Sequence, residues 1–266
     1  MSAYHPKKRL GQHFLTDKET IERIIKSINP KISDRILEIG PGRGVLTEPL
    51  AASGAEILAV EFDEDLIRAL SKKLSGYENV KILCTDFLLY EPDPSFWKSF
   101  VLVGNLPYNI TTPVIDWCVR YRSFIERACF MVQKEIARRL AAEPGQKDWS
   151  PLSILSQVFF DIGILFEVPP SSFKPPPKVD SAVVALTPRR KYDIADFGKF
   201  EKVVRASFVK RRKLLLNNLV GEIVPDARQA EQLIESLCFK ANCRAEELSI
   251  EQFLKLTNAL VSRNII

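Results

Sequence analysis

The spacing of hydrophobic residues along this 266-residue chain changes near residue 189. Before that point, short runs of consecutive apolar residues alternate with segments whose apolar residues recur every three or four positions. The first pattern is typical of buried strands and the second of amphipathic helices. After residue 189, helical spacing alone continues to the end. We therefore predict two domains, one over residues 1–188 and one over residues 189–266.

The first domain is predicted to be α/β. Its strands are expected at residues 35–39, 56–61, 80–84, 100–104, 128–132, 159–168 and 182–186. Its helices are expected at 17–28, 45–53, 63–74 and 112–121, and a further helix after the fifth strand is expected to end at residue 140. This alternation favours a doubly wound, mostly parallel sheet. The last two strands leave no room for a helix between them, so we expect an antiparallel edge strand. The segment between them, 169–180, is rich in proline and is expected to lack regular structure.

The second domain is predicted to be small and all-α, with helices at 197–219 (broken near residue 210), 227–238 and 249–262. Its sequence holds 15 Lys/Arg against 10 Asp/Glu, and the first 13 residues form an arm with three further cations. The net charge of the whole chain is +5, which leaves residues 14–188 at −3. Basic ends around an acidic middle suggest a polyanionic partner, although solvated helix faces would give a similar charge pattern.

Composition excludes several classes of protein. No apolar run approaches the roughly 18 residues that a membrane span requires, and residues 1–9 lack the apolar centre of a signal peptide. The five cysteines are scattered and the chain has two histidines, so we expect reduced thiols in a cytoplasmic protein and no metal. We also expect a monomer.

A glycine-rich loop follows the first predicted strand, in the stretch Glu38-Ile-Gly-Pro-Gly-Arg-Gly44. Gly40 and Gly42 allow a sharp turn and a close approach to a ligand. Val45 stands where a dinucleotide motif that starts at Gly40 needs its last glycine, and no Lys-Ser/Thr pair follows for a phosphate loop. A cofactor with a nucleoside but no pyrophosphate fits this loop better. S-adenosylmethionine is such a cofactor.

Two acidic residues follow the next two strands. Glu61 ends the second strand and can accept hydrogen bonds from both ribose hydroxyls of a nucleoside, as acids at this position do in nucleotide-binding sheets. Asp86 follows the third strand and can accept from the exocyclic amine of an adenine. Either residue alone would more simply be a helix cap or a surface charge. Together with the glycine loop, they predict a nucleoside site at the carboxyl edge of the sheet.

The fourth strand ends in Gly104-Asn-Leu-Pro-Tyr108. The Asn105 side-chain oxygen and the Leu106 carbonyl can accept the two N–H groups of a planar amine, and Pro107 stiffens the turn. Tyr108 can stack on the base that carries the amine and stabilise developing positive charge. This stretch predicts a methyl-accepting site for an adenine. A plain strand-to-turn exit is the alternative for the tetrapeptide by itself.

The proline-rich segment is predicted to complete the site. A base cannot reach such a pocket from inside a duplex, so the target must be unpaired or flipped. Phe173 could sandwich the base against Tyr108, at about 1–3 kcal/mol per stacked face. Lys174 and Lys178 could hold the flanking phosphates. Alternatively, Phe173 is an ordinary packing residue.

Five stretches together resemble the small-subunit (16S-type) ribosomal RNA adenine N6,N6-dimethyltransferase family. These are Gly11–Leu15, Glu38–Gly44, Asn105–Tyr108, Phe173–Ser181 and Ser207–Lys213, and the resemblance runs from about residue 7 to the C-terminus. It implies a Rossmann-like methyltransferase that uses S-adenosylmethionine to dimethylate two adjacent adenines. These adenines lie in the 3′-terminal hairpin loop of small-subunit rRNA, within a pre-assembled 30S particle during ribosome biogenesis. The resemblance places cofactor contacts at His13, Leu15, Gly40, Glu61, Asp86 and Asn105, although bacterial members usually have Asn where His13 stands.

The basic run Lys210-Arg211-Arg212-Lys213 is expected to open a helix and to contact rRNA phosphates, or else to be a solvated helix start. Two other functions remain possible. One is methylation of a large-subunit rRNA adenine by the antibiotic-resistance branch of the fold, whose members typically have Ile in place of Leu106. The other is a non-catalytic RNA-binding assembly factor, which the intact Asn105–Tyr108 stretch and glycine loop disfavour.

Overall fold

The computed structural model describes residues 13–210 and 212–266. Its contacts divide the protein into two compact units. One unit combines the described part of Met1–Arg138 with Phe160–Pro188, and the other combines Arg139–Phe159 with Arg189–Ile266. Each unit has a hydrophobic cluster of its own. The domain boundary near residue 189 stays a prediction.

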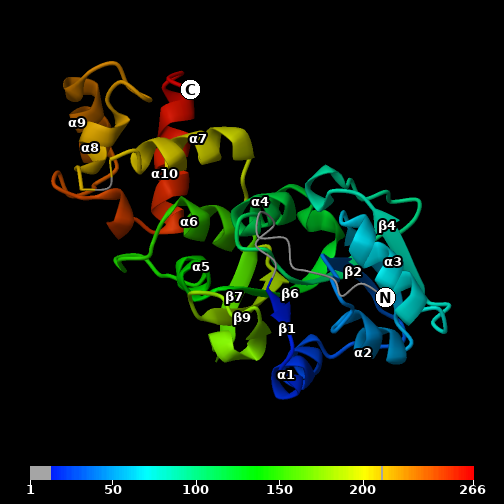
Figure 1. Cartoon of the computed structure of the whole chain (residues 1–266). Helices are drawn as coiled ribbons and strands as arrows, with labels where there is room; N and C mark the ends of the chain where they lie inside the picture. The colour runs from blue at the N-terminus through cyan, green and yellow to red at the C-terminus, as the bar shows by residue number, and fades with distance from the viewer. Residues whose placement is uncertain (1–12, 211) are drawn as a thin grey trace. The chain divides into compact units, whose positions relative to one another are not determined.

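A seven-stranded sheet forms the centre of the first unit (Figure 1). In spatial order its strands are β4 (Val80–Cys84), β3 (Glu56–Glu61), β2 (Arg35–Ile39), β5 (Phe100–Asn105), β6 (Ile125–Gln133), β9 (Ser181–Pro188) and β7 (Phe160–Val168). The five strands from β4 to β6 are parallel, and β9 pairs antiparallel with both of its neighbours. The predicted fold class is confirmed. The antiparallel strand itself lies one place in from the edge, which β7 occupies.

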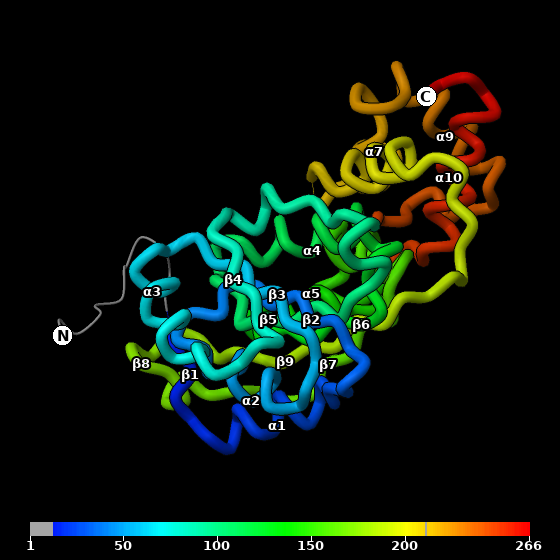
Figure 2. The backbone as a smooth tube through the Cα atoms, turned by 90° about the vertical axis from the view of Figure 1, so that its right-hand side faces the viewer, coloured from blue at the N-terminus to red at the C-terminus, as the bar shows by residue number. Residues whose placement is uncertain are grey.

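Helices cover both faces of this sheet. Helices α1 (Lys18–Ile28) and α2 (Thr47–Ala52) lie on one face, and α4 (Thr111–Arg120) lies on the other (Figure 2). Strands β2, β3 and β5 are buried along almost their whole length, as expected for parallel strands covered on both sides. Helix α3 (Glu64–Lys73) begins at Asp63, whose side chain accepts from the Asp65 N–H. Helix α5 (Lys134–Leu140) follows β6 directly.

A two-stranded pair lies apart from the main sheet. Strand β1 (Phe14–Leu15) pairs antiparallel with β8 (Phe173–Lys174), which sets Leu15 opposite Phe173. The expectation that 169–180 lacks regular structure is therefore wrong in part, since a 3-10 turn (Pro170–Ser172) and β8 form there. Phe173 and Lys174 precede the prolines at 175–177, so they keep the N–H groups that a strand pair requires. The pairing holds Phe14 and Leu15 against the proline-rich segment.

The second unit is helical. It contains α6 (Pro151–Gln157), α7 (Phe197–Ser207), α8 (Leu215–Leu219), α9 (Ala227–Ser236) and α10 (Ile250–Ser262). Trp149, Phe200 and Phe253 are fully buried at its centre, and the Trp149 Nε1–H donates to the Leu248 carbonyl over 3.0 Å. No helix among residues 13–210 and 212–266 is long and apolar enough to cross a membrane.

Candidate active site

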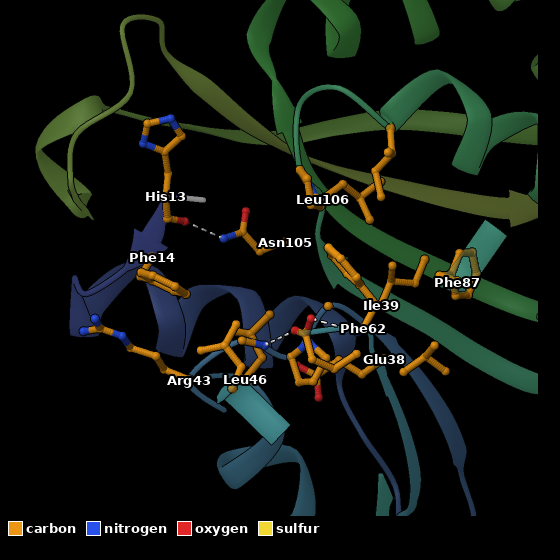
Figure 3. Close-up of a pocket in the computed structure, with 18 of the residues that line it drawn as sticks. His13, Phe14, Glu38, Ile39, Arg43, Leu46, Phe62, Phe87, Asn105 and Leu106 are labelled. Atoms are coloured by element: carbon orange, nitrogen blue, oxygen red, sulfur yellow. Dashed lines mark hydrogen bonds between the residues drawn. The ribbon is translucent and has the colours of Figure 1, made fainter. Parts of the chain in front are cut away.

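A cavity of about 260 Å³ lies at the carboxyl ends of β2, β3 and β5 (Figure 3). Its lining includes every residue for which the sequence predicts a cofactor or catalytic role: His13, Leu15, Gly40, Gly42, Glu61, Asp86, Asn105, Leu106, Pro107, Tyr108 and Phe173. Six segments of the chain that are separated in sequence thus meet around one space. The individual roles of these residues stay predictions.

The glycine loop forms one wall of the cavity. Gly40, Gly42 and Gly44 all have positive φ, at 59°, 56° and 69°, which L side chains adopt at a cost. A Cβ on Gly40 would meet no atom within 4 Å, so the backbone there borders open space. At Gly40 the loop therefore presents bare backbone to the cavity, against which a ligand can lie closely.

Glu38 is the most unusual group in the cavity. It lies one residue before the end of β2, is 1% exposed, and its Oε2 atom has no hydrogen-bond partner among the described residues. Burial raises the pKa of Glu38 to about 7; the Thr47 hydroxyl beside it opposes this rise, and the nearby Glu61 carboxylate adds to it. An orphaned, buried carboxylate oxygen is costly. A ligand with a cationic or N–H group would satisfy it, and S-adenosylmethionine carries both.

The carboxylates of Glu61 and Asp86 already accept hydrogen bonds from backbone N–H groups. Glu61 Oε1 accepts from the N–H groups of Phe62 (2.9 Å) and Asp63 (3.0 Å), and Oε2 accepts from the Gly42 N–H (3.2 Å). Burial raises the pKa of Glu61, while these three donors oppose the rise. A carboxylate oxygen accepts about two hydrogen bonds. Oε2 can therefore accept a hydrogen bond from one ribose hydroxyl more easily than from both. Asp86 Oδ1 accepts from the Leu88 N–H.

The orientation of the Asn105 amide follows from its neighbour. Asn105 Nδ2 donates to the His13 carbonyl over 3.3 Å, as the dashed line in Figure 3 shows. A carbonyl can only accept, so the NH₂ group must face His13 and the Asn105 oxygen is left as an acceptor. The Leu106 N–H donates to the Met131 carbonyl over 3.0 Å, which fixes the next peptide in place. The predicted pair of acceptors thus sits on an ordered turn.

Tyr108 is half-buried and fixed at its polar end. Its hydroxyl is 2.7 Å from the hydroxyl of Ser181, which is fully buried. Burial raises the pKa of Tyr108, so its hydroxyl stays neutral over the physiological range. Phe173 is 2% exposed and packs in the hydrophobic cluster that contains Leu15. Lys174 and Lys178 are exposed and are not part of the cavity lining.

Gly104 on β5 lies opposite Ile39 on β2. A Cβ there would be 2.9 Å from the Ile39 carbonyl oxygen, a backbone atom. We expect Gly104→Ala to lower the free energy of unfolding by about 1–3 kcal/mol, as overpacking does, and to reduce activity because Asn105 is displaced. Urea unfolding followed by tryptophan fluorescence measures the first effect. Gly163→Ala in β7, where a Cβ would meet no atom within 4 Å, is the control, and equal stability of the two variants would contradict the argument.

The basic run in the second unit is placed differently from expectation. Lys210, Arg212 and Lys213 are exposed and lie in a turn between α7 and α8, so the prediction that they open a helix is wrong, whereas the break near residue 210 is confirmed. Arg211 lies outside the described residues. Buried Asn218 shapes this turn: its Oδ1 accepts from the Lys210 N–H (2.9 Å), and its Nδ2 donates to the Ser207 carbonyl (2.8 Å). These hydrogen bonds take the place of the backbone hydrogen bonds that a helix would make here.

Sequence reasoning gave no role to Glu38 or Ser181. An acidic residue inside the apolar run 35–39 was the available signal for Glu38. Ser181 carries no such signal, because its contact with Tyr108 joins residues 73 positions apart. No cluster of His, Cys, Asp or Glu suited to a metal is found in the part of the chain that the structure describes.

The fold and the cavity define a Rossmann-like methyltransferase. A profile of the family described as "Ribosomal RNA adenine dimethylase" matches residues 4–261. The chain therefore belongs to the ribosomal RNA adenine dimethylase family and is an rRNA-methylating enzyme. The family prediction is confirmed.

Individual relatives agree with this assignment. The chain is 40% identical to "Ribosomal RNA small subunit methyltransferase A" of Synechocystis sp., over 97% of each chain. It is 41% identical to the protein of the same name in Saccharophagus degradans, over 98% of this chain and 96% of the other. Among crystal structures, a dimethyladenosine transferase from Plasmodium falciparum aligns with a TM-score of 0.83 at 27% identity, over 95% and 98% of the two chains. The 23S rRNA methyltransferase ErmE aligns with a TM-score of 0.72 at 32% identity, over 93% and 99%.

Proposed function

We propose that this enzyme uses S-adenosylmethionine to dimethylate the N6 amines of two adjacent adenines in the 3′-terminal hairpin loop of small-subunit rRNA. The substrate is a pre-assembled 30S particle in the cytoplasm, and the enzyme acts as a monomer during ribosome biogenesis. The full-length similarity to relatives named for the small subunit supports the choice of subunit. The oriented Asn105 amide is the observation that carries the chemistry.

The cofactor would be held by residues at the ends of β2, β3 and β4. The glycine loop would border its amino-acid part, and the Glu38 Oε2 atom would accept from its ammonium group. Glu61 would accept from a ribose hydroxyl through Oε2, and Asp86 would accept from the adenine amine. Bound there, the cofactor supplies a methyl group on a positively charged sulfur.

The target amine is activated by acceptors on the protein. The Asn105 oxygen and the Leu106 carbonyl accept its two N–H groups, which favours a pyramidal nitrogen with a directed lone pair. That lone pair would be directed at the methyl group, and Tyr108 would stabilise the positive charge that develops on the base. The proton then leaves the cationic nitrogen to water, so no strong base is required.

The second methylation requires the pocket to bind the amine differently. After one transfer the amine has a single N–H, so Asn105 and Leu106 cannot both be satisfied. Stacking on Tyr108 keeps the base in place while the methylated amine rotates. The pocket therefore combines a pair of acceptors for the first methyl with an aromatic clamp for both.

Large-subunit methylation is the rival function, supported by the similarity to ErmE. Leu106 is the residue that argues against it, since that branch typically has Ile there. Transfer of labelled methyl groups to purified, undermethylated small subunits and to purified large subunits separates the two functions. We expect label in the small subunit, and label confined to the large subunit would refute the proposal.

The exposed basic turn is proposed to contact rRNA phosphates. We expect Arg212→Ala with Lys213→Ala to weaken binding to small subunits and to reduce the slope of log K against log salt by about 1–2, because roughly one counterion is released per phosphate contact. Binding is measured by sedimentation at several salt concentrations. The double change Lys202→Ala with Lys255→Ala removes two exposed charges from helices of the same unit. An equal loss of slope in this control would show that general charge, and not the turn, matters.

A further inference from the structure

The side chain of Lys73 reaches the glycine loop from outside the cavity. Lys73 lies in the last turn of α3, and its Nζ atom donates to the carbonyls of Arg43 (3.4 Å) and Gly44 (3.2 Å). It also forms an ion pair with Glu48 on α2 over 2.8 Å. Lys73 is not among the residues that line the cavity. An effect of Lys73 on a bound ligand would therefore act through the loop.

Close packing of α3 against Gly44 makes these contacts possible. A Cβ on Gly44 would lie 2.5 Å from Leu70 Cδ1 and 3.8 Å from Lys73 Cδ. The absence of a side chain at this glycine thus lets the Lys73 stem lie beside the loop. The Lys73 side chain is 37% exposed, so its ammonium group keeps part of its hydration while it donates to the two carbonyls.

The loop depends on contacts from its surroundings to keep one conformation, because glycine has more conformational freedom to lose than any other residue. Within the loop, the Gly44 N–H donates to the Pro41 carbonyl over 2.8 Å. On the cavity side, the Arg43 guanidinium lies 4.4 Å from the centroid of the Phe14 ring (Figure 3). Phe14 Cε1 is in turn 3.3 Å from the place of a Cβ on Gly42. Lys73 supplies the contact on the outer side of the same loop.

Lys73 also acts on the charge of Glu38. Burial raises the pKa of Glu38, the Thr47 hydroxyl opposes this rise, and the Glu61 carboxylate adds to it. The Lys73 ammonium group opposes the rise as well. These three residues face Glu38 from α2, β3 and α3. Loss of the Lys73 charge would therefore leave Glu38 protonated up to a higher pH.

We propose that Lys73 is a positioning residue for the cofactor, whose ammonium group holds the Arg43 and Gly44 carbonyls and thereby keeps the glycine loop in the conformation that receives the ligand. This inference rests on the proposed function, because it takes S-adenosylmethionine to lie against the loop. It assigns a role in cofactor binding to a residue that touches neither the cofactor nor the target base.

The test measures the Kd of S-adenosylmethionine by calorimetry for the full chain and its variants. Lys73→Met keeps the apolar stem and removes the donors. We expect it to raise the Kd about fivefold, or about 1 kcal/mol, which is the lower range for charge-assisted hydrogen bonds of a partly exposed group. The kcat for small subunits at saturating cofactor should stay within about twofold. Lys73→Arg keeps the charge and the donors and should restore the Kd to within about twofold of the wild type.

A second readout separates positioning from a general loss of stability. Binding of the cofactor ammonium group requires ionised Glu38, so the protons released at pH 7 report how much of Glu38 is protonated beforehand. Calorimetry in two buffers of different ionisation enthalpy should show a larger release for Lys73→Met than for the wild type. Lys72→Met, which removes the neighbouring charge from the same turn of α3, should change neither the Kd nor the proton release.

Three outcomes overturn the proposal. An unchanged Kd in Lys73→Met would remove the role. An equal loss of affinity in Lys72→Met would show that general charge on α3 matters and the loop contact does not. An equal loss in Glu48→Gln, which removes the ion pair and leaves the Lys73 donors, would assign the effect to the ion pair. If the wild type itself binds no S-adenosylmethionine, the proposed function fails, and that result is distinct from all three.

Discussion

Asn105→Ala is expected to lower kcat for methyl transfer by about 100- to 1,000-fold, the usual effect of losing one preorganised polar contact with a transition state. The change removes the acceptor that directs the lone pair of the target amine. The cofactor Kd should weaken only in part, because Glu38, Glu61 and the glycine loop stay in place. Single-turnover methylation of small subunits, with calorimetry for the cofactor, separates the two effects.

The control for this variant is Asn217→Ala, an exposed asparagine on α8. It should leave kcat unchanged. Full dimethylation of small-subunit rRNA by Asn105→Ala at the wild-type rate would contradict the assigned role. A tenfold or greater loss of cofactor affinity with an intact rate at saturation would make Asn105 a cofactor residue instead.

Glu38→Gln is expected to stabilise the ligand-free enzyme at pH 8 while it weakens cofactor binding. Burial raises the pKa of Glu38 from 4.5 to about 7, so the folded state binds a proton that the unfolded state has already lost. The contribution of Glu38 to the free energy of unfolding therefore falls as the pH rises from about 4.5 to about 7 and is constant above that range. At 1.36 kcal/mol per pKa unit, the full loss is about 3 kcal/mol. The free energy of unfolding of Glu38→Gln should not show this fall.

Urea unfolding at several pH values tests this expectation, with Glu64→Gln as the control at an exposed position on α3. For the cofactor, the lost carboxylate should raise the Kd about tenfold, as expected for one charge-assisted hydrogen bond. Binding below pH 7 should also release a proton, which calorimetry in two buffers of different ionisation enthalpy detects. A wild-type stability that rises between pH 5 and 7 relative to Glu38→Gln would contradict the argument.

The sheet was the most predictable part of this protein. Strands β2, β3 and β4 begin and end at the predicted residues, because parallel strands appear in sequence as apolar runs with clear ends. Helix α6 was missed, since it has seven residues and buries two serines, Ser153 and Ser156, so it shows no amphipathic period. The β1–β8 pair was missed because two residues per strand carry no pattern. Its formation depends on contacts between segments about 160 positions apart.

The candidate site was predictable in its membership and not in its orientation. Residues at successive strand ends meet at one edge of a parallel sheet, so Glu61, Asp86 and Asn105 could be grouped from the sequence. Tertiary contacts determine the orientation of the Asn105 amide and the stacked arrangement of the His13 and Tyr108 rings. The path of the basic turn likewise depends on the buried Asn218, which has no signature of its own.

The proposed function is tested most directly by mass mapping of methyladenosine in rRNA from cells with and without this protein. We expect two adjacent N6,N6-dimethyladenosines near the 3′ end of small-subunit rRNA when the protein is present. Both should be unmodified in its absence, and they should be restored by the wild type and not by Asn105→Ala. Two dimethylated adenines that persist without the protein, or a loss of methylation confined to large-subunit rRNA, would contradict the proposed function.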